Sequence, residues 1–359
     1  MKIVSVVGAR PEFVQVAPLC RVLREAHREV LVHTGQHYDD QMSKVFFEEL
    51  SIPKPDYDLG VGSGSHAEQT ATILTRFEEV VLKERPDLVI IRGDTNSTLA
   101  AALVASKLGI AIAHVEAGER SYLRTMPEEI NRVVADRITD LFLCVSKRAV
   151  ANLAKEGITD GVHIVGDVMF DALLHAQPIA RQKSDVLARH QLEPKKYILA
   201  TVHRAENTNA PARLRGILEG LGGLEVPVVL PIHPRTAAAM KDHGITAPAG
   251  VRIVPPFSYY DMLVAEENAL AIGTDSGGVQ REAYCLSIPC VTLRDETEWS
   301  ETVEAGWNRL SGANPHAIRG AFAAARAPEG DKPPIFGDGG AAHHIKRVLD
   351  GWERAKKGG

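Results

Sequence analysis

The stretch Gly273-Thr274-Asp275-Ser276-Gly277-Gly278-Val279-Gln280-Arg281-Glu282 carries the most informative local pattern in the chain. The apolar run Leu270–Ile272 before it predicts a short buried strand, and Val279–Leu286 predicts a helix. Glycine lets the backbone approach a ligand closely, and the first N–H groups of a helix lack helical partners and attract anions. A glycine-rich turn without a ligand is the alternative, since short glycine motifs have many false positives. The pattern therefore predicts a phosphate-binding turn at Ser276, Gly277 and Gly278, with Glu282 placed to accept hydrogen bonds from a ribose.

Short apolar runs alternate with amphipathic stretches along most of the chain. In the first half, strands are expected at Lys2–Val7, Val30–His33, Asp87–Ile91, Ile110–His114, Leu141–Val145 and Val162–Val165. In the second half, they are expected at Tyr197–Thr201, Val228–Ile232, Val251–Val254, Ala269–Ile272 and Cys290–Thr292. Helices are expected from Arg10 and at Asp40–Leu50, Ala67–Glu84, Thr98–Lys107, Pro127–Arg137 and Lys147–Glu156. Apolar strands separated by helices are typical of parallel sheets covered on both faces, so we expect two α/β halves.

The length of the chain, 359 residues, exceeds one core of ordinary size and predicts two domains. The alternation pauses at Gly166–Gln191, which is interpreted as a connecting helix and linker. We expect an N-terminal domain over residues 1–168 and a C-terminal domain over residues 169–340. A loop rich in Gly, Pro and Ala then leads to a last helix, Ala341–Lys356, in a final segment over residues 341–359.

The composition is ordinary for a globular protein, with 45% hydrophobic and 24% charged residues. A formal net charge of -5 gives no electrostatic reason to expect nucleic acid or an anionic membrane as a partner. No apolar run approaches a membrane span, and no signal peptide is expected. The cysteines show no CxxC or Cys/His ligand spacing, so we expect reduced core thiols, no metal site and a cytoplasmic location; they are Cys20, Cys144, Cys285 and Cys290.

Polar residues follow several of the expected strands, and ligands of open parallel sheets bind beyond the carboxyl ends of strands. Asp94 and Glu116 each come just after such a strand, and Glu128 opens the expected helix Pro127–Arg137. Proton abstraction from carbon needs a base and a leaving group needs an acid, and carboxylates in a partly dry site can be tuned to both tasks. His203 and Arg10 would suit a pyrophosphate leaving group.

Each of these residues could instead have a structural role. Aspartate is a favoured helix N-cap residue, so Asp94 could cap the helix that follows it. Glu128 stands in a first helical turn, where a negative charge suits the helix dipole. A histidine after a strand, such as His203, is often a hydrogen-bonded structural residue. Glu116 is the hardest to explain structurally, because it stands between His114-Val115 and Ala117-Gly118, where a charge is out of place unless it faces a ligand.

Seven motifs together resemble those of one family, the non-hydrolysing UDP-N-acetylglucosamine 2-epimerases. In chain order they are GARPE, RGDTNST, HVEAG, PEEINR, HRAEN, TDSGGVQRE and TLRDETE, and the resemblance runs from Lys2 to about Gly312. It implies a glycosyltransferase-B-type fold, in which two Rossmann-like domains face a central cleft and the last helix packs back on the first domain. It also implies interconversion of UDP-GlcNAc and UDP-ManNAc by elimination of UDP to 2-acetamidoglucal and re-addition, without a cofactor. A homodimer serving polysaccharide biosynthesis is implied by the family alone.

The motifs carry the family's site residues over to this chain. Asp94, Glu116 and Glu128 match its catalytic carboxylates, and His203 matches its active-site histidine. Arg132 matches an arginine near the catalytic acids, and we expect it to contact the substrate. The positions that match UDP-binding residues are Arg10, Ser276, Gly277, Gly278 and Glu282, and we add Arg204 and His233, which follow strands of the second half, as candidate substrate-binding residues.

Two departures from the usual pattern leave the substrate open. Glu119-Arg120 stands where Leu-Arg is common, and Trp299-Ser300 stands where Arg-Pro is common. The stretches SYLRTMPEEINR and DETEW look more like the branch acting on UDP-2,3-diacetamido-2,3-dideoxyglucuronate, whose extra carboxylate would give Arg124 a role. Because a fold does not fix a function, the sequence is also compatible with a glycosyltransferase of the same fold, a hydrolysing relative, or a non-catalytic UDP-sugar-binding protein.

Overall fold

A computed structural model of the chain describes residues 1–36 and 47–358, except for the side chains of residues 10, 11, 354 and 356–358. The chain divides into two compact units, of which unit 1 combines Met1–Ala172 with Pro334–Gly359 and unit 2 is Leu173–Pro333. The division thus falls at residues 172 and 333, where the sequence suggested 168 and 340. The expected helix Asp40–Leu50 lies mostly outside the described residues.

Unit 1 is built on a parallel sheet that, in the described residues, has seven strands in the order β3-β2-β1-β4-β5-β6-β7. The strands are β1 (Lys2–Val7), β2 (Arg28–His33), β3 (Tyr57–Asp58), β4 (Leu88–Arg92), β5 (Ala111–Val115), β6 (Leu141–Cys144) and β7 (Val162–Ile164). The helices are α1 (Arg10–Leu23), α3 (His66–Glu84), α4 (Asn96–Lys107), α5 (Pro127–Arg137), α6 (Lys147–Lys155), α7 (Val168–Lys183), which crosses into unit 2, and α16 (Ala341–Gly358). The strand order reverses between β1 and β4, and ligands of such sheets bind at the carboxyl ends of the strands on either side of the reversal.

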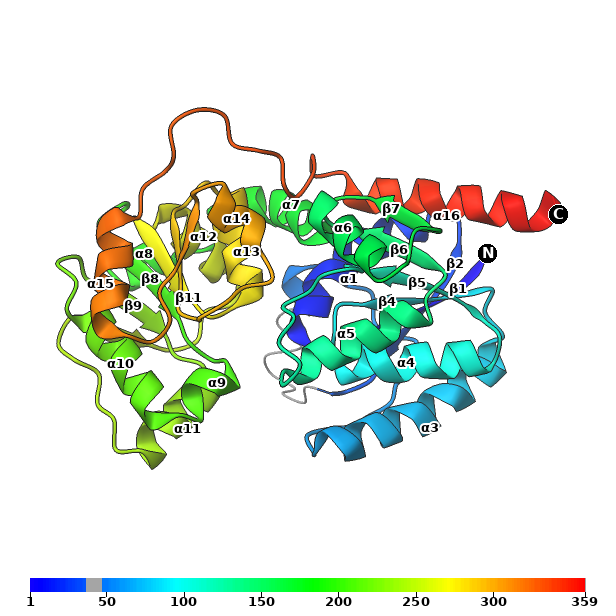
Figure 1. Cartoon of the computed structure of the whole chain (residues 1–359), viewed down its shortest axis with the longest axis horizontal. Helices are drawn as coiled ribbons and strands as arrows, with labels where there is room; N and C mark the ends of the chain where they lie inside the picture. The colour runs from blue at the N-terminus through cyan, green and yellow to red at the C-terminus, as the bar shows by residue number, and fades with distance from the viewer. Residues whose placement is uncertain (37–46, 359) are drawn as a thin grey trace. The chain divides into compact units, whose positions relative to one another are not determined.

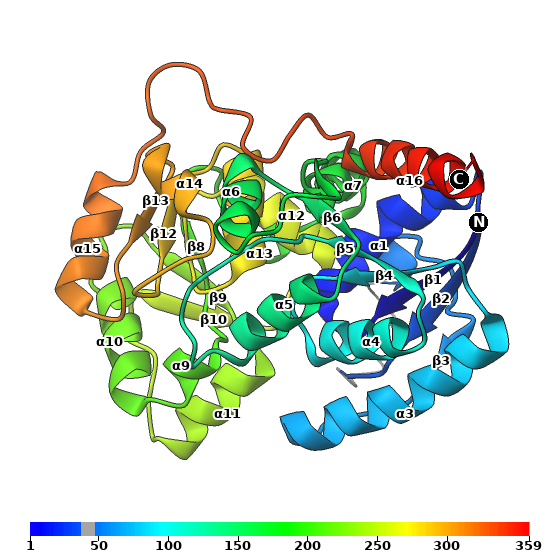
Figure 2. The same ribbon diagram turned by 45° about the vertical axis from the view of Figure 1, so that its right-hand side comes forward.

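Helices cover both faces of this sheet, as its apolar strands require. On one face, α3 and α4 lie side by side, as Figure 2 shows, and bury Phe77 and Ala101 against Val4 and Val89. On the other face, α16 runs beside α1, and its residue Ile345 shares a core with Leu19. The last helix of the chain is therefore part of the core of unit 1 (Figure 1).

A carboxylate on α7 fixes the start of α16. The Oδ1 and Oδ2 atoms of Asp171 accept hydrogen bonds from the backbone N–H groups of Ala341 at 3.0 Å and Ala342 at 2.7 Å. These are first-turn N–H groups that have no helical acceptor, so Asp171 acts as a cap supplied from elsewhere in the chain. Burial raises the pKa of Asp171, although its two backbone donors oppose that shift.

Unit 2 repeats the same topology. In the described residues its parallel sheet has six strands in the order β10-β9-β8-β11-β12-β13. The strands are β8 (Ile198–Thr201), β9 (Val228–Pro231), β10 (Val251–Val254), β11 (Ala271–Thr274), β12 (Cys290–Thr292) and β13 (Asn308–Leu310). The helices are α8 (Val186–Arg189), α9 (Ala205–Thr208), α10 (Pro211–Gly222), α11 (Pro234–Asp242), α12 (Tyr259–Asn268), α13 (Gly277–Cys285), α14 (Ser300–Glu304) and α15 (Pro315–Ala324). The order reverses between β8 and β11, so the expected ligand-binding edge lies after these strands.

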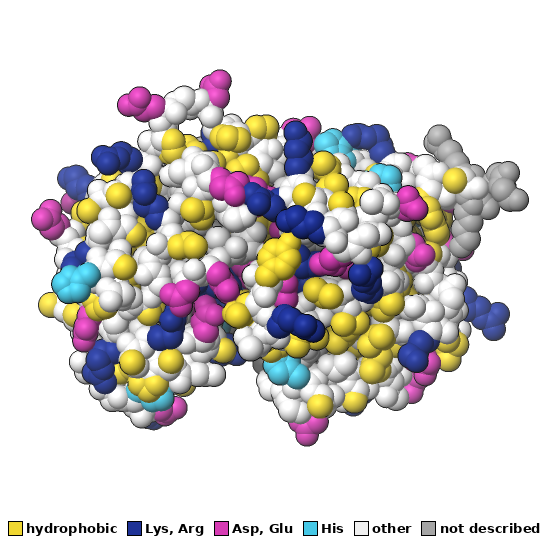
Figure 3. All heavy atoms as spheres, in the orientation of Figure 1, with side chains coloured by type: hydrophobic (Ala, Val, Ile, Leu, Met, Phe, Trp, Pro, Cys, Tyr) yellow, Lys and Arg dark blue, Asp and Glu magenta, His cyan; other side chains and the backbone are white. Residues whose placement is uncertain are grey.

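The structure confirms the α/β class predicted from the sequence, with two parallel sheets. The expected strands fall within two residues of the observed ones, and the Ser65–Glu68 capping box of α3 is present. All four cysteines are free thiols, of which Cys285 is half-buried and the others are buried. Among the described residues, no helix is long and apolar enough to cross a membrane. Basic and acidic side chains are interspersed over the face drawn in Figure 3.

Candidate active site

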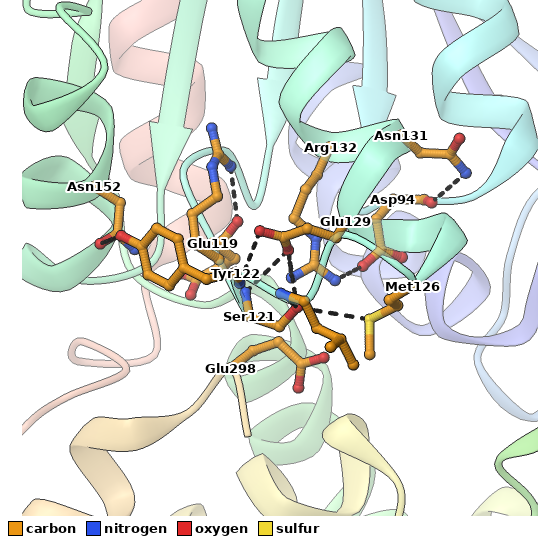
Figure 4. Close-up of polar contacts among 12 residues, drawn as sticks. Asp94, Glu119, Ser121, Tyr122, Met126, Glu129, Asn131, Arg132, Asn152 and Glu298 are labelled. Atoms are coloured by element: carbon orange, nitrogen blue, oxygen red, sulfur yellow. Dashed lines mark hydrogen bonds and ion pairs between the residues drawn. The ribbon is translucent and has the colours of Figure 1, made fainter. Parts of the chain in front are cut away.

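Asp94 lies in the turn after β4, at the strand-order reversal of unit 1. Its expected alternative role as a helix cap is wrong, because the cap of α4 is Thr95, whose hydroxyl accepts from the Thr98 N–H at 3.3 Å. The Asp94 carboxylate instead pairs with the guanidinium of Arg132, and Asn131 Nδ2 donates to the Asp94 carbonyl at 2.9 Å. Figure 4 shows both contacts reaching Asp94 from α5. Helix α5 thus fixes the position of this carboxylate.

Arg132 is almost fully buried and binds two acids at once. Its Nη1 lies 3.4 Å from Glu129 Oε2, and its Nη2 contacts Asp94. Only 5% of the Arg132 side chain is exposed, against 29% for Asp94, so the carboxylate is the more accessible partner. The planar guanidinium suits such a bridge, since its N–H groups form a rigid fork. Arg132 therefore holds Asp94, and its predicted contact with substrate stays a prediction.

Glu116 follows β5 and has a backbone conformation unusual for a residue with a side chain. Its φ angle is +72°, in the left-handed region that only glycine enters without cost. Gln15 Nε2, on α1, donates to Glu116 Oε2 at 2.5 Å, and the Glu116 N–H donates to the Leu143 carbonyl at 3.0 Å. Strained residues of this kind cluster at functional sites, which supports the functional interpretation of Glu116.

Glu128 and its neighbour Glu129 share the first turn of α5 but differ in environment. Glu129 is buried, and it accepts from the Ser121 N–H at 2.9 Å, the Ser121 hydroxyl at 3.1 Å and the Tyr122 N–H at 2.9 Å (Figure 4). Glu129 is therefore a structural carboxylate that holds the segment before α5. Glu128 is half-buried, and its catalytic role stays a prediction.

Glu12 is the acid of the GARPE motif, and the sequence alone indicated no role for it. This fully buried carboxylate accepts from the Ala9 N–H at 2.9 Å and the Thr95 hydroxyl at 2.7 Å, and also from the Gly8 N–H. Burial raises the pKa of Glu12 to about 7, against the lowering effect of Thr95 and the two backbone donors. It joins the turn after β1 to the turn that carries Asp94. The side chain of Arg10, predicted to bind UDP, lies outside the described residues.

In unit 2, Asp275 organises the turn that carries His203 and Arg204. The Asp275 carboxylate is fully buried after β11 and accepts from the backbone N–H groups of His203 and Arg204, and from Asn207 Nδ2, all at 3.0 Å. The His203 Nδ1 atom lies 3.5 Å from Asp275 Oδ1. Sequence reasoning missed this role, although Asp275 directly precedes Ser276 and follows the strand at the topological switch point.

The phosphate-binding turn predicted at Ser276–Gly278 is the start of α13. Ser276 is the N-cap, and its hydroxyl accepts from the Val279 N–H at 3.4 Å. In the described part of the chain, the N–H groups of Gly277 and Gly278 have no hydrogen-bond acceptor. A Cβ atom on Gly277 would lie 3.2 Å from Trp299 Nε1 and 3.9 Å from Arg204 Nη2. A cation and an indole N–H thus border a bare helix N-terminus, which is an arrangement suited to phosphate.

Trp299 is held in place by an aromatic contact with a second arginine. The Arg281 guanidinium carbon lies 4.3 Å from the centre of the Trp299 ring, and both side chains are buried. This stacking on Arg281, on α13, orients the indole with its N–H beside Gly277. Trp299 is thus a further site residue that the predicted set lacked, and its departure from the family pattern was the only signal.

His203 and His233 lie together after β8 and β9. Their ring centres are 5.3 Å apart, and His233 Nδ1 accepts from the Arg235 N–H at 3.1 Å. Because that nitrogen is an acceptor, His233 carries its ring proton on Nε2 when it is neutral. Glu282 lies on α13 and is buried, and its predicted contact with a ribose stays a prediction.

The predicted residues therefore form two groups, each within its own unit. In unit 1, α5 contacts Asp94 directly, and Glu116 follows the adjacent strand. In unit 2, His203, Arg204 and His233 follow strands on the same edge as the start of α13. The first group offers carboxylates for proton transfer and the second offers donors for a phosphate. Within residues 1–36 and 47–358, no three His, Cys, Asp or Glu side chains are grouped to hold a metal ion.

Comparisons with known proteins find relatives that match this chain over nearly its whole length. A family model described as UDP-N-acetylglucosamine 2-epimerase matches residues 21–350. A Methanococcus maripaludis protein named as a homolog of that enzyme is 46% identical over 97% of this chain and 99% of its own length. The UDP-2,3-diacetamido-2,3-dideoxy-D-glucuronate 2-epimerase of Pseudomonas aeruginosa is 43% identical over 97% of this chain and 99% of its own length.

Several solved structures are similar over nearly the whole chain, and one of them holds UDP-GlcNAc and UDP. It is the crystal structure of the Methanocaldococcus jannaschii UDP-GlcNAc 2-epimerase in complex with UDP-GlcNAc and UDP. Its TM-score is 0.92, its sequence identity is 42%, and the match covers 98% of this chain and 99% of that one. This similarity confirms the predicted glycosyltransferase-B-type fold class.

Proposed function

The chain belongs to the UDP-N-acetylglucosamine 2-epimerase family, and from that premise we propose that it interconverts UDP-GlcNAc and UDP-ManNAc without hydrolysis. A base removes the proton from C2 of the sugar while the bond from C1 to the UDP oxygen breaks, which leaves 2-acetamidoglucal and UDP. UDP then re-adds to C1 and an acid returns a proton to the opposite face of C2. No oxidation level changes, so the reaction needs no nicotinamide.

The observation that carries this proposal is the pair of carboxylates at the carboxyl ends of adjacent strands. Asp94 follows β4 and Glu116 follows β5, and each is held by a nitrogen donor, Arg132 for the first and Gln15 for the second. Two differently held carboxylates suit a reaction that must both take and return a proton. We propose that Asp94, Glu116 and Glu128 carry these steps.

Most of the residues that we propose to bind UDP lie in unit 2. We propose that Ser276, Gly277, Gly278, Arg204 and His203 bind the diphosphate of UDP, that Arg10 and His233 assist, and that Glu282 binds the ribose. The bare N–H groups at the start of α13 and the Arg204 guanidinium support this assignment, because both stabilise negative charge that grows as UDP leaves.

UDP-2,3-diacetamido-2,3-dideoxyglucuronate is the second candidate substrate, with the same mechanism. Arg124 is exposed in the segment between Arg120 and Pro127, and it has no ion-pair partner among the described residues. A cation there suits the carboxylate of that substrate, and one relative at 43% identity is named for it. If this is the substrate, Arg124→Ala should raise its KM about tenfold and leave UDP affinity unchanged.

Two further features, a homodimer and a role in polysaccharide biosynthesis, are proposed on the resemblance alone. We also propose a cytoplasmic location, which the four free thiols support. Light scattering coupled to size exclusion tests the dimer directly, since a mass near 38.9 kDa would contradict it.

The decisive experiment is proton NMR in D₂O with each UDP-sugar supplied separately. Deuterium at C2 with the UDP linkage intact supports epimerisation, and the substrate that exchanges identifies the branch. Release of a free sugar identifies a hydrolase, and transfer to an added acceptor identifies a glycosyltransferase. No exchange with either sugar, despite UDP binding, would leave a binding protein and refute the proposal.

A further inference from the structure

Asp136, in the last turn of α5, contacts the chain on both sides of Glu116. It is 1% exposed, and its Oδ1 atom lies 2.7 Å from His114 Nδ1. Its Oδ2 atom accepts from the Gly118 N–H at 3.1 Å and from Arg120 Nη1 at 2.7 Å. The residues two before and two after Glu116 are therefore tied to the same carboxylate.

His114 extends this connection to the turn that carries Asp94. Its second ring nitrogen, Nε2, lies 2.8 Å from the carbonyl oxygen of Gly93, which directly precedes Asp94. Both nitrogens of His114 face oxygen acceptors, one a carboxylate and one a carbonyl. The buried ring therefore bridges Asp136 on α5 and the turn that carries Asp94.

The charges in this buried cluster compensate one another. Asp136 faces His114 and the Arg120 guanidinium, and Arg120 also pairs with Glu156 through Nε at 2.7 Å and Nη2 at 2.9 Å. Burial raises the pKa of Asp136, but His114 and Arg120 lower it more, and the net effect is a pKa below the usual range. Asp136 is thus ionised, as its three donors require.

The turn held by Asp136 has little freedom to rearrange. A Cβ atom on Gly118, whose φ is +83°, would lie 2.6 Å from the Ala149 carbonyl oxygen. The same stretch holds Glu116 at its positive φ of 72°. A residue persists in such a conformation only when its surroundings impose it, and Asp136 is the group that contacts both ends of the stretch.

We propose that Asp136 is a positioning residue that sets the placement of the Asp94 and Glu116 carboxylates relative to one another. It acts on Glu116 through the Gly118 N–H and on Asp94 through His114 and the Gly93 carbonyl. This inference rests on the proposed function, because it concerns the two carboxylates assigned to proton transfer. Helix α5 then serves both acids, since Arg132 and Asp136 lie one turn apart on the same face.

The test is Asp136→Asn, which keeps the side-chain volume but replaces one acceptor oxygen with a donor. We expect the rate of C2 deuterium exchange to fall about 10²-fold or more, with KM within about threefold of wild type. UDP affinity, proposed to reside in unit 2, should not change. In protein labelled with ¹⁵N-histidine, the ring signals of His114 should shift, because Asp136→Asn changes the partner of its Nδ1 atom.

Glu156→Gln is the matched control, because it breaks the other side of Arg120 and leaves the Asp136 contacts to His114 and Gly118 in place. Exchange in this variant should stay within about threefold of wild type. If Asp136→Asn does not fold, His114→Gln removes the link to Gly93 and is expected to show the same loss of rate. Protection of the buried Cys144 thiol reports that unit 1 is folded in each variant.

A folded Asp136→Asn protein that exchanges as fast as wild type would overturn the inference. So would a Glu156→Gln variant as slow as Asp136→Asn. Wild-type protein that shows no exchange would instead refute the proposed function, so the two failures are distinguishable.

Discussion

Glu12→Gln should change how the stability of unit 1 depends on pH. Glu12 is fully buried, and its pKa in the folded protein is about 7, against an ordinary value of 4.5. Between these two values the unfolded chain has lost the proton and the folded chain still holds it. The free energy of unfolding therefore falls as pH rises from 4.5 to 7, and it stays at the lower value above pH 7.

The size of the effect follows from the difference between the two pKa values. Each pKa unit corresponds to about 1.4 kcal/mol, so the shift from 4.5 to about 7 costs the folded state roughly 3 kcal/mol by pH 8. Glutamine resembles the protonated acid and does not titrate. The free energy of unfolding of the variant, relative to that of wild type, should therefore rise by about 3 kcal/mol between pH 4.5 and pH 8. This corresponds to roughly 1–3 M in the urea midpoint.

Cysteine labelling reads the two units separately. Protein equilibrated in urea at several pH values is pulsed with methyl methanethiosulfonate, and the modified thiols are identified by mass spectrometry. Cys20 and Cys144 report unit 1, and the buried Cys290 of unit 2 is the internal control, whose midpoint should match in both proteins. If the urea midpoints of unit 1 in wild type and variant differ by the same amount at pH 4.5 and pH 8, Glu12 is ionised throughout and the reasoning is refuted.

Three further outcomes are expected. Asp275→Asn leaves the His203 and Arg204 N–H groups facing an amide, so UDP affinity in calorimetry should fall at least tenfold; unchanged affinity would contradict the role given to this turn. Trp299→Phe keeps the ring over Arg281 but removes the indole N–H beside Gly277, and should raise the UDP dissociation constant about three- to tenfold; an equal constant would remove Trp299 from the site. Asp171→Ala removes the acceptor of two first-turn N–H groups of α16 and should destabilise unit 1 by about 1–2 kcal/mol. Amide hydrogen exchange in α16 should become faster, while exchange in α13, the reference helix in unit 2, should not change.

The elements of regular structure were largely predictable because their apolar residues repeat with a clear period. β1 and α5 begin and end at the predicted residues, since their apolar patterns are bounded by Gly8 and by Pro127. The short strands β3 and β13 were missed, because two or three residues carry no period of their own and are strands only through pairing with β2 and β12.

The site was predictable as a set of residues but not as a set of contacts. Asp94 was also compatible with a helix cap, and only the structure shows that Thr95 fills that position while Arg132 binds the Asp94 carboxylate. Asp136 by itself was not predictable, because a carboxylate late in a helix is usually exposed. The only hint was its spacing from Glu129 and Arg132, which places all three charged residues on one face of α5, and the structure shows that this face is buried.

The return of α16 to unit 1 has a consequence for how the protein is made on the ribosome. The sheet of unit 1 is synthesised first, but the helix that covers Leu19 and Val22 is translated only after all of unit 2. At about 5–20 residues per second, that apolar surface stays exposed for on the order of ten to forty seconds before α16 is synthesised. The nascent chain therefore passes through a stage in which unit 2 can fold completely while unit 1 still exposes this apolar surface. Chaperone capture during translation should accordingly centre on α1.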